Sequence, residues 1–262
     1  MVAATVLAKP ATVLAKPVRE VGAFFGLSLD ILVHFARRPF AWREFVHQSW
    51  FTARVSLAPA IMLAIPYNVL IQFILNILLF EIGAGDSAGT GAALSVLTQQ
   101  APQTTLFTIG GAAATAMCAD LGARTIREEI DAMKVMGVNP IQTLAVPRVA
   151  ALVVNAVLLT AVVGILGLAG SYVFSVYVEH VTPGAFMAGL TLVVGLPDVI
   201  FCFVKAALFG LAGGLIACYK GFTVGGGPQG VGNAVNETVV YTLLALFVIN
   251  TVITALSSKL VV

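Results

Sequence analysis

Long stretches with almost no charge constrain this chain more than any other feature of its sequence. Five occur, and each has the length of about 20 residues that a helix needs to cross a bilayer. They lie at approximately 55–80, 94–119, 146–178, 193–219 and 238–257. Only 10% of the 262 residues are charged and 59% are hydrophobic, whereas soluble domains average about 25% charged residues. The sequence therefore predicts an all-α polytopic membrane protein with five transmembrane helices.

The lysines and arginines indicate the orientation of these spans. Residues 1–54 hold seven of them, residues 120–148 hold four and residues 220–237 hold one, whereas residues 81–93 and 179–192 hold none. Cytoplasmic loops are enriched in Lys and Arg. This alternation predicts a cytoplasmic N-terminus and a periplasmic C-terminus, in a multi-pass protein of the plasma (inner) membrane.

Three regions follow from the distribution of apolar and charged residues. Residues 1–18 contain the tandem repeat ATVLAKP, and because each copy ends in Lys-Pro we expect a flexible basic tail. Residues 19–53 mix helically spaced apolar residues with aromatic and arginine side chains, which suits an interfacial amphipathic helix region. Residues 54–262 then form the membrane domain.

A short charged helix is predicted within the segment EEIDAMKVMGVNP, residues 128–140. Apolar residues recur at helical spacing, namely Ile126, Ile130, Met133 and Met136. Oppositely charged residues have the spacing of helical neighbours, namely Arg124–Glu128, Arg127–Asp131 and Asp131–Lys134. Gly137 suits a left-handed cap and Pro140 prevents continuation. The charges alone fit a solvated loop helix equally well, but the methionine-containing stripe favours a docking surface.

Amide side chains inside the spans are further candidates. Three of them recur every four residues on one face of the first span, which prolines kink. Amides are costly against lipid, so this face is predicted to point into the protein, toward a lipid cavity or a dimer interface. The candidates for either role are Pro66, Asn68, Gln72, Asn76, Gln99 and Gln100.

Asp198 and Lys205 are the charges that lie well inside a span, seven residues apart on one helical face. Intramembrane ionisable residues are functional candidates, so an ion-coupled secondary transporter that uses them, with Asp120, is an alternative function. Lys205 could also snorkel or pair with a neighbouring subunit, and Asp198 could lie at the outer interface. Five spans without internal duplication favour a dimer or larger complex over a self-contained carrier.

Other classes of site find little support. Residues 225–230 match G-x-G-x-x-G, but no strand precedes them and Pro228 interrupts them. No P-loop occurs, so this chain is not expected to bind ATP. The three cysteines are read as small apolar residues in membrane helices, and the three histidines are far apart. We therefore expect no bound cofactor, no metal, no catalytic residue and no nucleic acid.

The segment Ala119–Ala151 resembles the signature of the MlaE/YrbE permeases. The resemblance is carried by EEIDAM, MGVNP and VPR, and the order of spans agrees over nearly the whole chain. Members of this family are membrane subunits of ABC systems that act on lipids together with MCE-domain proteins. The resemblance implies that residues 54–262 form a non-catalytic permease domain.

The resemblance also implies partners and a role for the charged segment. In that family this segment is the coupling helix that docks on a cytoplasmic ATPase dimer, which binds ATP and Mg²⁺. The implied docking residues are Glu128, Glu129, Asp131, Ala132, Met133, Lys134, Met136 and Gly137. An MCE-protein hexamer and a lipid substrate are the other implied partners.

Two stretches depart from the Mla-type pattern by lacking its charges, namely residues 99–102 and 111–114. In this respect the chain looks more like the YrbE permeases of actinobacterial (mycobacterial) Mce lipid importers, in which two non-identical permeases pair. The resemblance thus implies import of fatty-acid-like or sterol-like lipids by a heterodimer rather than a homodimer. A non-transporting membrane scaffold is the third hypothesis.

Overall fold

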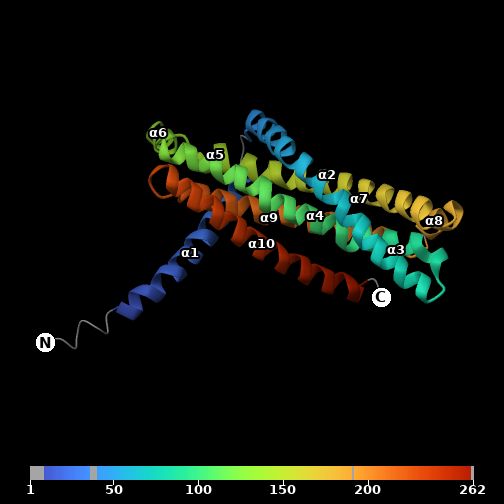
Figure 1. The fold of residues 1–262 in the computed structure, drawn as a ribbon. Helices are drawn as coiled ribbons and strands as arrows, with labels where there is room; N and C mark the ends of the chain where they lie inside the picture. The colour runs from blue at the N-terminus through green and yellow to red at the C-terminus, as the bar shows by residue number, and fades with distance from the viewer. Residues whose placement is uncertain (1–8, 36–39, 191, 261–262) are drawn as a thin grey trace.

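The computed structural model describes residues 9–35, 40–190 and 192–260, and this part of the chain is helical without strands (Figure 1). The helices and helical segments are, in chain order, α1 (Lys9–Phe35), α2 (Trp42–Glu81), η1 (Gly85–Ser87), α3 (Ala88–Ser95), η2 (Val96–Gln100), α4 (Ala101–Thr108), η3 (Ile109–Ala113), α5 (Ala114–Ile126), α6 (Glu129–Val135), η4 (Ile141–Ala145), α7 (Val146–Val173), η5 (Phe174–Val178), α8 (Pro183–Gly189), α9 (Leu196–Phe222) and α10 (Gly227–Leu260). Segments η2 to η5 are π-helical and η1 is a 3₁₀ turn.

Five helical runs within the described residues are long and apolar enough to cross a membrane, which confirms the predicted fold class. They are Trp42–Glu81, Ala88–Ile126, Ile141–Val178, Leu196–Phe222 and Gly227–Lys259. Four of them exceed the predicted span because the helix continues beyond the apolar window, whereas Leu196–Phe222 has the predicted length and is shifted by three residues from 193–219.

Helix α7 lies at the centre of the bundle, packed between α2 and α9, and α9 also packs against α5 and α10 (Figure 1). The main hydrophobic core joins α5, α7, α9 and α10 around residues such as Met117, Leu152 and Phe209. The outer spans α2 and α10 have only 22% of their apolar windows buried, against 50–61% for the other three. Their outward faces are therefore left to lipid or to another chain.

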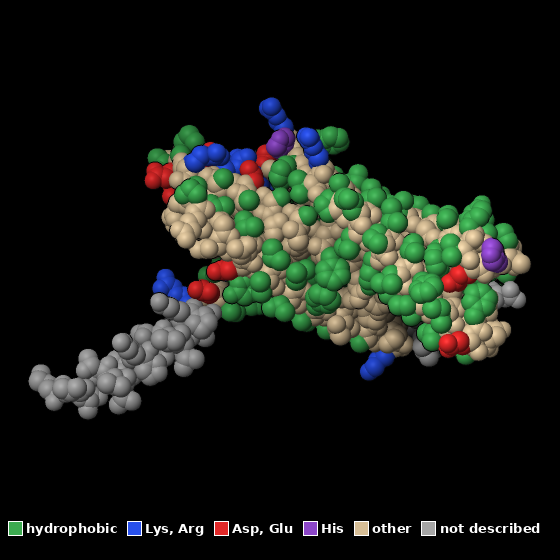
Figure 2. Space-filling view, in the orientation of Figure 1, with side chains coloured by type: hydrophobic (Ala, Val, Ile, Leu, Met, Phe, Trp, Pro, Cys, Tyr) green, Lys and Arg blue, Asp and Glu red, His purple; other side chains and the backbone are tan. Residues whose placement is uncertain are grey.

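Charged side chains gather at one end of the bundle, around α6, whereas hydrophobic side chains cover much of its length (Figure 2). The opposite end carries α3 and α8, which pack through a small cluster that includes Ala92 and Phe186. A bundle with an apolar flank and one strongly charged end matches the dimensions and polarity of a bilayer.

The predicted tail, residues 1–18, lies partly outside the described residues and stays a prediction. Residues 1–8 are not described, and residues 9–18 lie in helix α1. Pro10 falls in the first turn, where a helix does not use the missing N–H, and a single interior proline, Pro17, removes only one backbone hydrogen bond. One face of α1 contacts the bundle through Phe24 and Ile31, and its other face is exposed.

The predicted interfacial region, residues 19–53, includes parts of two helices, α1 and α2. Helix α2 runs without a break from Trp42 through the first span, because neither glycine nor proline interrupts residues 42–58.

The glycine-rich stretch between α9 and α10 is short. Gly227 has a positive φ of 80° and Pro228 opens α10, so this helix begins well before residue 238.

Candidate functional site

Helix α6 is a short helix bounded at both ends by left-handed residues. Glu128, with φ of 60°, reverses the chain after α5, and Gly137, with φ of 76°, ends the helix. The amide of Gly137 donates to the carbonyl of Lys134 at 3.0 Å, and the amide of Val138 donates to Met133 at 2.9 Å. These two bonds form a Schellman cap. The predicted stop at Gly137 is confirmed, and α6 is held in one defined place.

The apolar residues of α6 face two directions. Ile130 is buried and Met133 packs against the main core, so these two side chains fix the helix to its own chain. Val135 and Met136 point outward, with 89% and 70% of their surface exposed. The predicted continuous stripe is therefore divided, and Ile126 lies on α5, on the other side of the reversal at Glu128.

The ion pairs around α6 follow from the same reversal. Asp131 and Lys134 pair at 2.8 Å, as their spacing predicts. The other two predicted pairs are replaced by pairs of Arg127 and Arg124 with Glu129, at 2.9 Å and 3.9 Å. A left-handed residue interrupts helical register, so i,i+4 spacing does not carry across residue 128.

A charge cluster around the buried Arg148 lies next to α6, and the sequence did not predict it. The guanidinium of Arg148, which is fully buried, contacts Asp120 of α5 at 2.5 Å and Glu44 of α2 at 3.3 Å. It also donates to the carbonyl of Leu144 at 3.2 Å. Asp120 in turn pairs with Arg124 at 3.4 Å. One signal was available: Arg148 directly follows Pro147 at the point where an apolar span begins.

The cluster connects elements that are far apart in the sequence. It runs from Glu129 on α6 through Arg124 and Asp120 on α5 to Arg148 on α7 and Glu44 on α2. Ion pairs with buried members hold their geometry more strictly than exposed ones, because the charge has no solvent to replace its partner. The link to α6 is the 3.9 Å contact of Arg124 with Glu129, in which both side chains are partly exposed.

The polar face of the first span points into the protein, as predicted, and it packs against α7 and η5. Asn68, Gln72 and Asn76 are almost fully buried. The amide of Asn76 donates to the hydroxyl of Ser175 at 2.9 Å, and Gln72 donates to Asn76 at 2.7 Å. An ideal Cβ on Gly167 would lie 2.6 Å from the Asn68 amide oxygen, which shows how closely the two helices approach.

The other candidates of this group lie apart from that face. Pro66 is exposed on α2, Gln99 is half-buried and Gln100 is buried, donating to Ser95 at 2.9 Å. None of the grooves described below is lined by them. A role in a lipid path therefore stays a prediction for all six residues.

The two intramembrane charges of the fourth span do not meet. Asp198 accepts the backbone N–H of Gly195 at 3.0 Å, so it caps the start of α9. Lys205, which is buried, donates to the carbonyl of Thr98 and the hydroxyl of Thr254, both at 2.9 Å. No ion pair of Lys205 occurs among the described residues.

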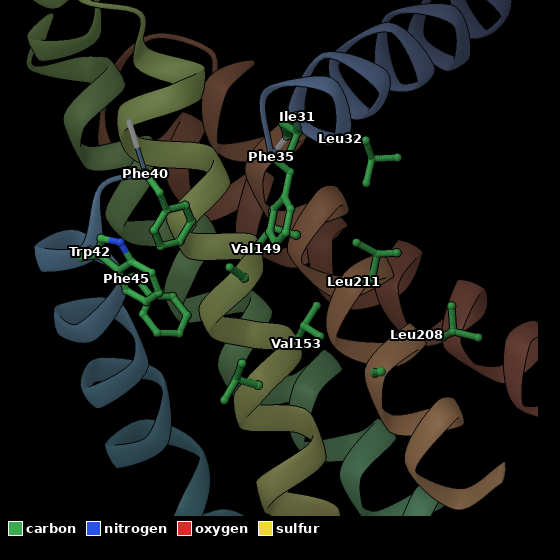
Figure 3. A pocket seen from close by; sticks show the side chains of 13 residues that line it. Ile31, Leu32, Phe35, Phe40, Trp42, Phe45, Val149, Val153, Leu208 and Leu211 are labelled. Atoms are coloured by element: carbon green, nitrogen blue, oxygen red, sulfur yellow. The ribbon is translucent and has the colours of Figure 1, made fainter. Parts of the chain in front are cut away.

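Two apolar grooves lie on the sides of the bundle. The first, of about 460 Å³, lies between α1, α2, α7 and α9 and is lined by apolar side chains that include Phe35, Phe40 and Val149 (Figure 3). The second, of about 590 Å³, lies between α1, α9 and α10, with Lys220 at its rim, 2.6 Å from Glu237. Both fit apolar occupants such as acyl chains.

The described part of the chain holds no group of His, Cys, Asp and Glu side chains that could bind a metal. Five membrane-spanning helical runs define a polytopic membrane protein, with a capped charged helix at one end and an ionic cluster around the buried Arg148 next to it.

Comparison with known proteins identifies the family to which this membrane protein belongs. Residues 45–256 match the model of the family described as Permease MlaE. The chain is 30% identical over 232 residues to a probable ABC transporter permease protein of Synechocystis sp., covering 88% of each chain. It is 26% identical over 241 residues to one of Rickettsia conorii, covering 92% of this chain and 93% of the relative. This chain belongs to the MlaE permease family.

A plant relative is also similar. The chloroplastic protein TRIGALACTOSYLDIACYLGLYCEROL 1 of Arabidopsis thaliana is 27% identical over 216 residues, which is 82% of this chain and 61% of the relative. The chain is accordingly a multi-pass membrane permease rather than an enzyme. The likeness to ABC permeases inferred from EEIDAM, MGVNP and VPR is confirmed at the level of the family.

Proposed function

We propose that this chain is the permease subunit of an ATP-driven lipid transporter, and that α6 is the element on which a cytoplasmic ATPase dimer docks. The observation that carries this proposal is that the apolar side chains of α6 face two directions. Ile130 and Met133 fix the helix to the bundle, while Val135 and Met136 present apolar surface outward beside Asp131 and Lys134. Exposed methionines rimmed by charge suit a docking surface.

The ionic cluster around Arg148 would transmit a movement of α6 to the membrane-spanning helices. A displacement of α6 would be transmitted through Glu129, Arg124 and Asp120. Asp120 and Glu44, at the start of α2, both pair with Arg148. Helix α2 has its outward face free over most of the first span. ATP and Mg²⁺ would be bound by the ATPase, and the docking helix would convert the movement of that subunit into displacement of α2 and α7.

A lipid substrate is supported by the apolar grooves and by the plant relative, which is named after a galactosyl diacylglycerol. The exposed faces of α2 and α10 favour a second permease copy, and the missing charges at residues 99–102 and 111–114 favour a non-identical one. An MCE-protein hexamer on the periplasmic side and import of fatty-acid-like or sterol-like lipids complete the proposal.

The orientation is part of the same proposal. The α6 end carries Arg124, Arg127, Lys134 and Lys220, and placing this end in the cytoplasm satisfies the positive-inside rule. The N-terminus then lies in the cytoplasm and the C-terminus in the periplasm of an inner-membrane protein.

The proposal is tested by co-purification of an ATPase with variants of α6. Met136→Glu introduces a charge at a 70% exposed position, so it should leave insertion and folding unchanged while abolishing ATPase association. Gln229→Glu, a change at an exposed position in the first turn of α10 at the same end of the bundle, is the matched control. Full ATPase recovery with Met136→Glu, or equal loss with both variants, would reject docking through α6.

A further inference from the structure

Lys205 lies deep in the bundle, where it joins three of the five spans. The residue is only 2% exposed and sits on α9. Its ammonium donates at 2.9 Å to the carbonyl of Thr98, in η2, and at 2.9 Å to the hydroxyl of Thr254, in α10. Both acceptors are uncharged, and a lysine in a span is too costly to be retained without bonding partners.

The acceptor in η2 is a carbonyl whose α-helical donor is missing. In an α-helix the carbonyl of Thr98 would accept the N–H of the residue four positions later, which here is Pro102. Proline has no N–H, and its ring pushes that carbonyl away from the helix axis. The chain directly before Pro102 is π-helical, from Val96 to Gln100, so the backbone has already departed from regular hydrogen bonding.

We propose that Lys205 is a positioning residue that supplies the donor which Pro102 lacks, and that it holds the π-helical segment η2 against α9 and α10. A buried carbonyl without a donor is a destabilising group in a membrane, where water cannot replace the bond. The long lysine side chain reaches from α9 to this carbonyl and still bonds Thr254. The charge at residue 205 thereby serves backbone hydrogen bonding rather than ion coupling.

This inference is independent of the proposed transport function, because it concerns one backbone carbonyl and one side chain. It predicts a coupling between Lys205 and Pro102 that has a definite sign. Pro102→Ala restores an N–H at the position four residues after Thr98, so the carbonyl regains its helical donor. Removing the ammonium should then matter much less.

The test is a double-mutant cycle on the full chain in detergent, read by thermal unfolding. We expect Lys205→Met to lower Tm by about 3–10 °C, because a buried carbonyl and a hydroxyl lose their donor. In the Pro102→Ala background the same substitution should lower Tm by less than half as much. Hydrogen exchange of residues 94–106 should rise in Lys205→Met and return toward the original level in the double variant.

Two controls separate this coupling from a general effect. Pro66→Ala restores an N–H toward the carbonyl of Met62, which Lys205 does not contact, so it should leave the cost of Lys205→Met unchanged. Thr254→Val removes the second acceptor, together with the bond from its hydroxyl to the carbonyl of Asn250, and should not be compensated by Pro102→Ala. If Lys205→Met fails to fold alone while Lys205→Met/Pro102→Ala folds, the proposal is supported. Additive losses in the Lys205–Pro102 cycle, or equal rescue by Pro66→Ala, would overturn it.

Discussion

The buried guanidinium of Arg148 in α7 donates to the carboxylate of Asp120 in α5 at 2.5 Å. Arg148 is completely buried, whereas its two carboxylate partners, Asp120 and Glu44, keep 32% and 25% of their side-chain surface exposed. The cluster therefore lies at the boundary between the bundle interior and the charged end. Through these ion pairs, side chains of three spans and of α6 contact one another.

Arg148→Met should destabilise the protein strongly. Removing one partner of a buried pair costs about 3–5 kcal/mol, and the lower end applies because both carboxylates retain some solvent contact. We expect a decrease in Tm of about 6–12 °C, measured by thermal unfolding in detergent. Lys134→Met, which breaks the exposed pair with Asp131, is the matched control and should cost less than about 1 kcal/mol. Equal effects of the two substitutions would contradict the role given to the cluster.

The contact between α7 and α9 depends on a glycine. An ideal Cβ on Gly210 would lie 2.6 Å from the Cα of Val153 and 2.7 Å from the carbonyl oxygen of Leu152. Gly210→Ala should therefore force the helices apart and lower the free energy of unfolding by about 1–3 kcal/mol, as expected for overpacking, and thermal unfolding would show this as a lower Tm. Gly232→Ala, in α10 with nothing within 4 Å, should be neutral or stabilising. A neutral Gly210→Ala would show that the helices separate without cost.

The stability of the folded protein should depend on pH through the carboxyl of Glu179. Burial raises the pKa of the Glu179 carboxyl above its ordinary value, and a hydrogen bond from Asn76 opposes this shift. A carboxyl with a raised folded-state pKa binds more protons when folded, so stability falls as pH rises from the unfolded-state pKa through the raised value. Glu179→Gln should therefore have the higher Tm at pH 8, and the difference should shrink toward pH 4. A difference independent of pH would mean that this carboxyl does not titrate as described.

The orientation can be tested with two methionines at opposite ends of the bundle. Met136 on α6 is 70% exposed and Met187 on α8 is 53% exposed, whereas Cys118, Cys202 and Cys218 are buried. With the α6 end in the cytoplasm, a membrane-impermeant thiol reagent should label Met187→Cys in intact cells, and Met136→Cys only after permeabilisation. The reverse pattern would invert the topology.

The spans were predictable because lipid imposes a minimum length on every crossing helix and excludes charge from it. The cap at Gly137 was predictable for a similarly local reason, since a left-handed residue before Asn139-Pro140 favours glycine. The face that α6 presents was not predictable. It depends on the left-handed conformation of Glu128, which rotates α6 relative to α5 and turns Met133 inward.

The ionic cluster and the bonds of Lys205 could not be read from the sequence because their partners come from different helices. Glu44 and Arg148 lie more than a hundred positions apart, as do Thr98 and Lys205. Spacing along one helix predicts neighbours only within that helix. Asp198 and Lys205 show the converse, since they share a helical face and yet bond to Gly195 and Thr98 respectively.

The central claim is that α6 contacts the ATPase, and photo-crosslinking from residue 136 tests it most directly. A photoreactive amino acid replaces Met136 in the assembled complex, and the same replacement of Met187 at the opposite end is the control. We predict an ultraviolet-dependent adduct with the ATPase from position 136 and none from position 187. A complex that retains its ATPase but gives no adduct from position 136, or gives equal adducts from both, would contradict the claim.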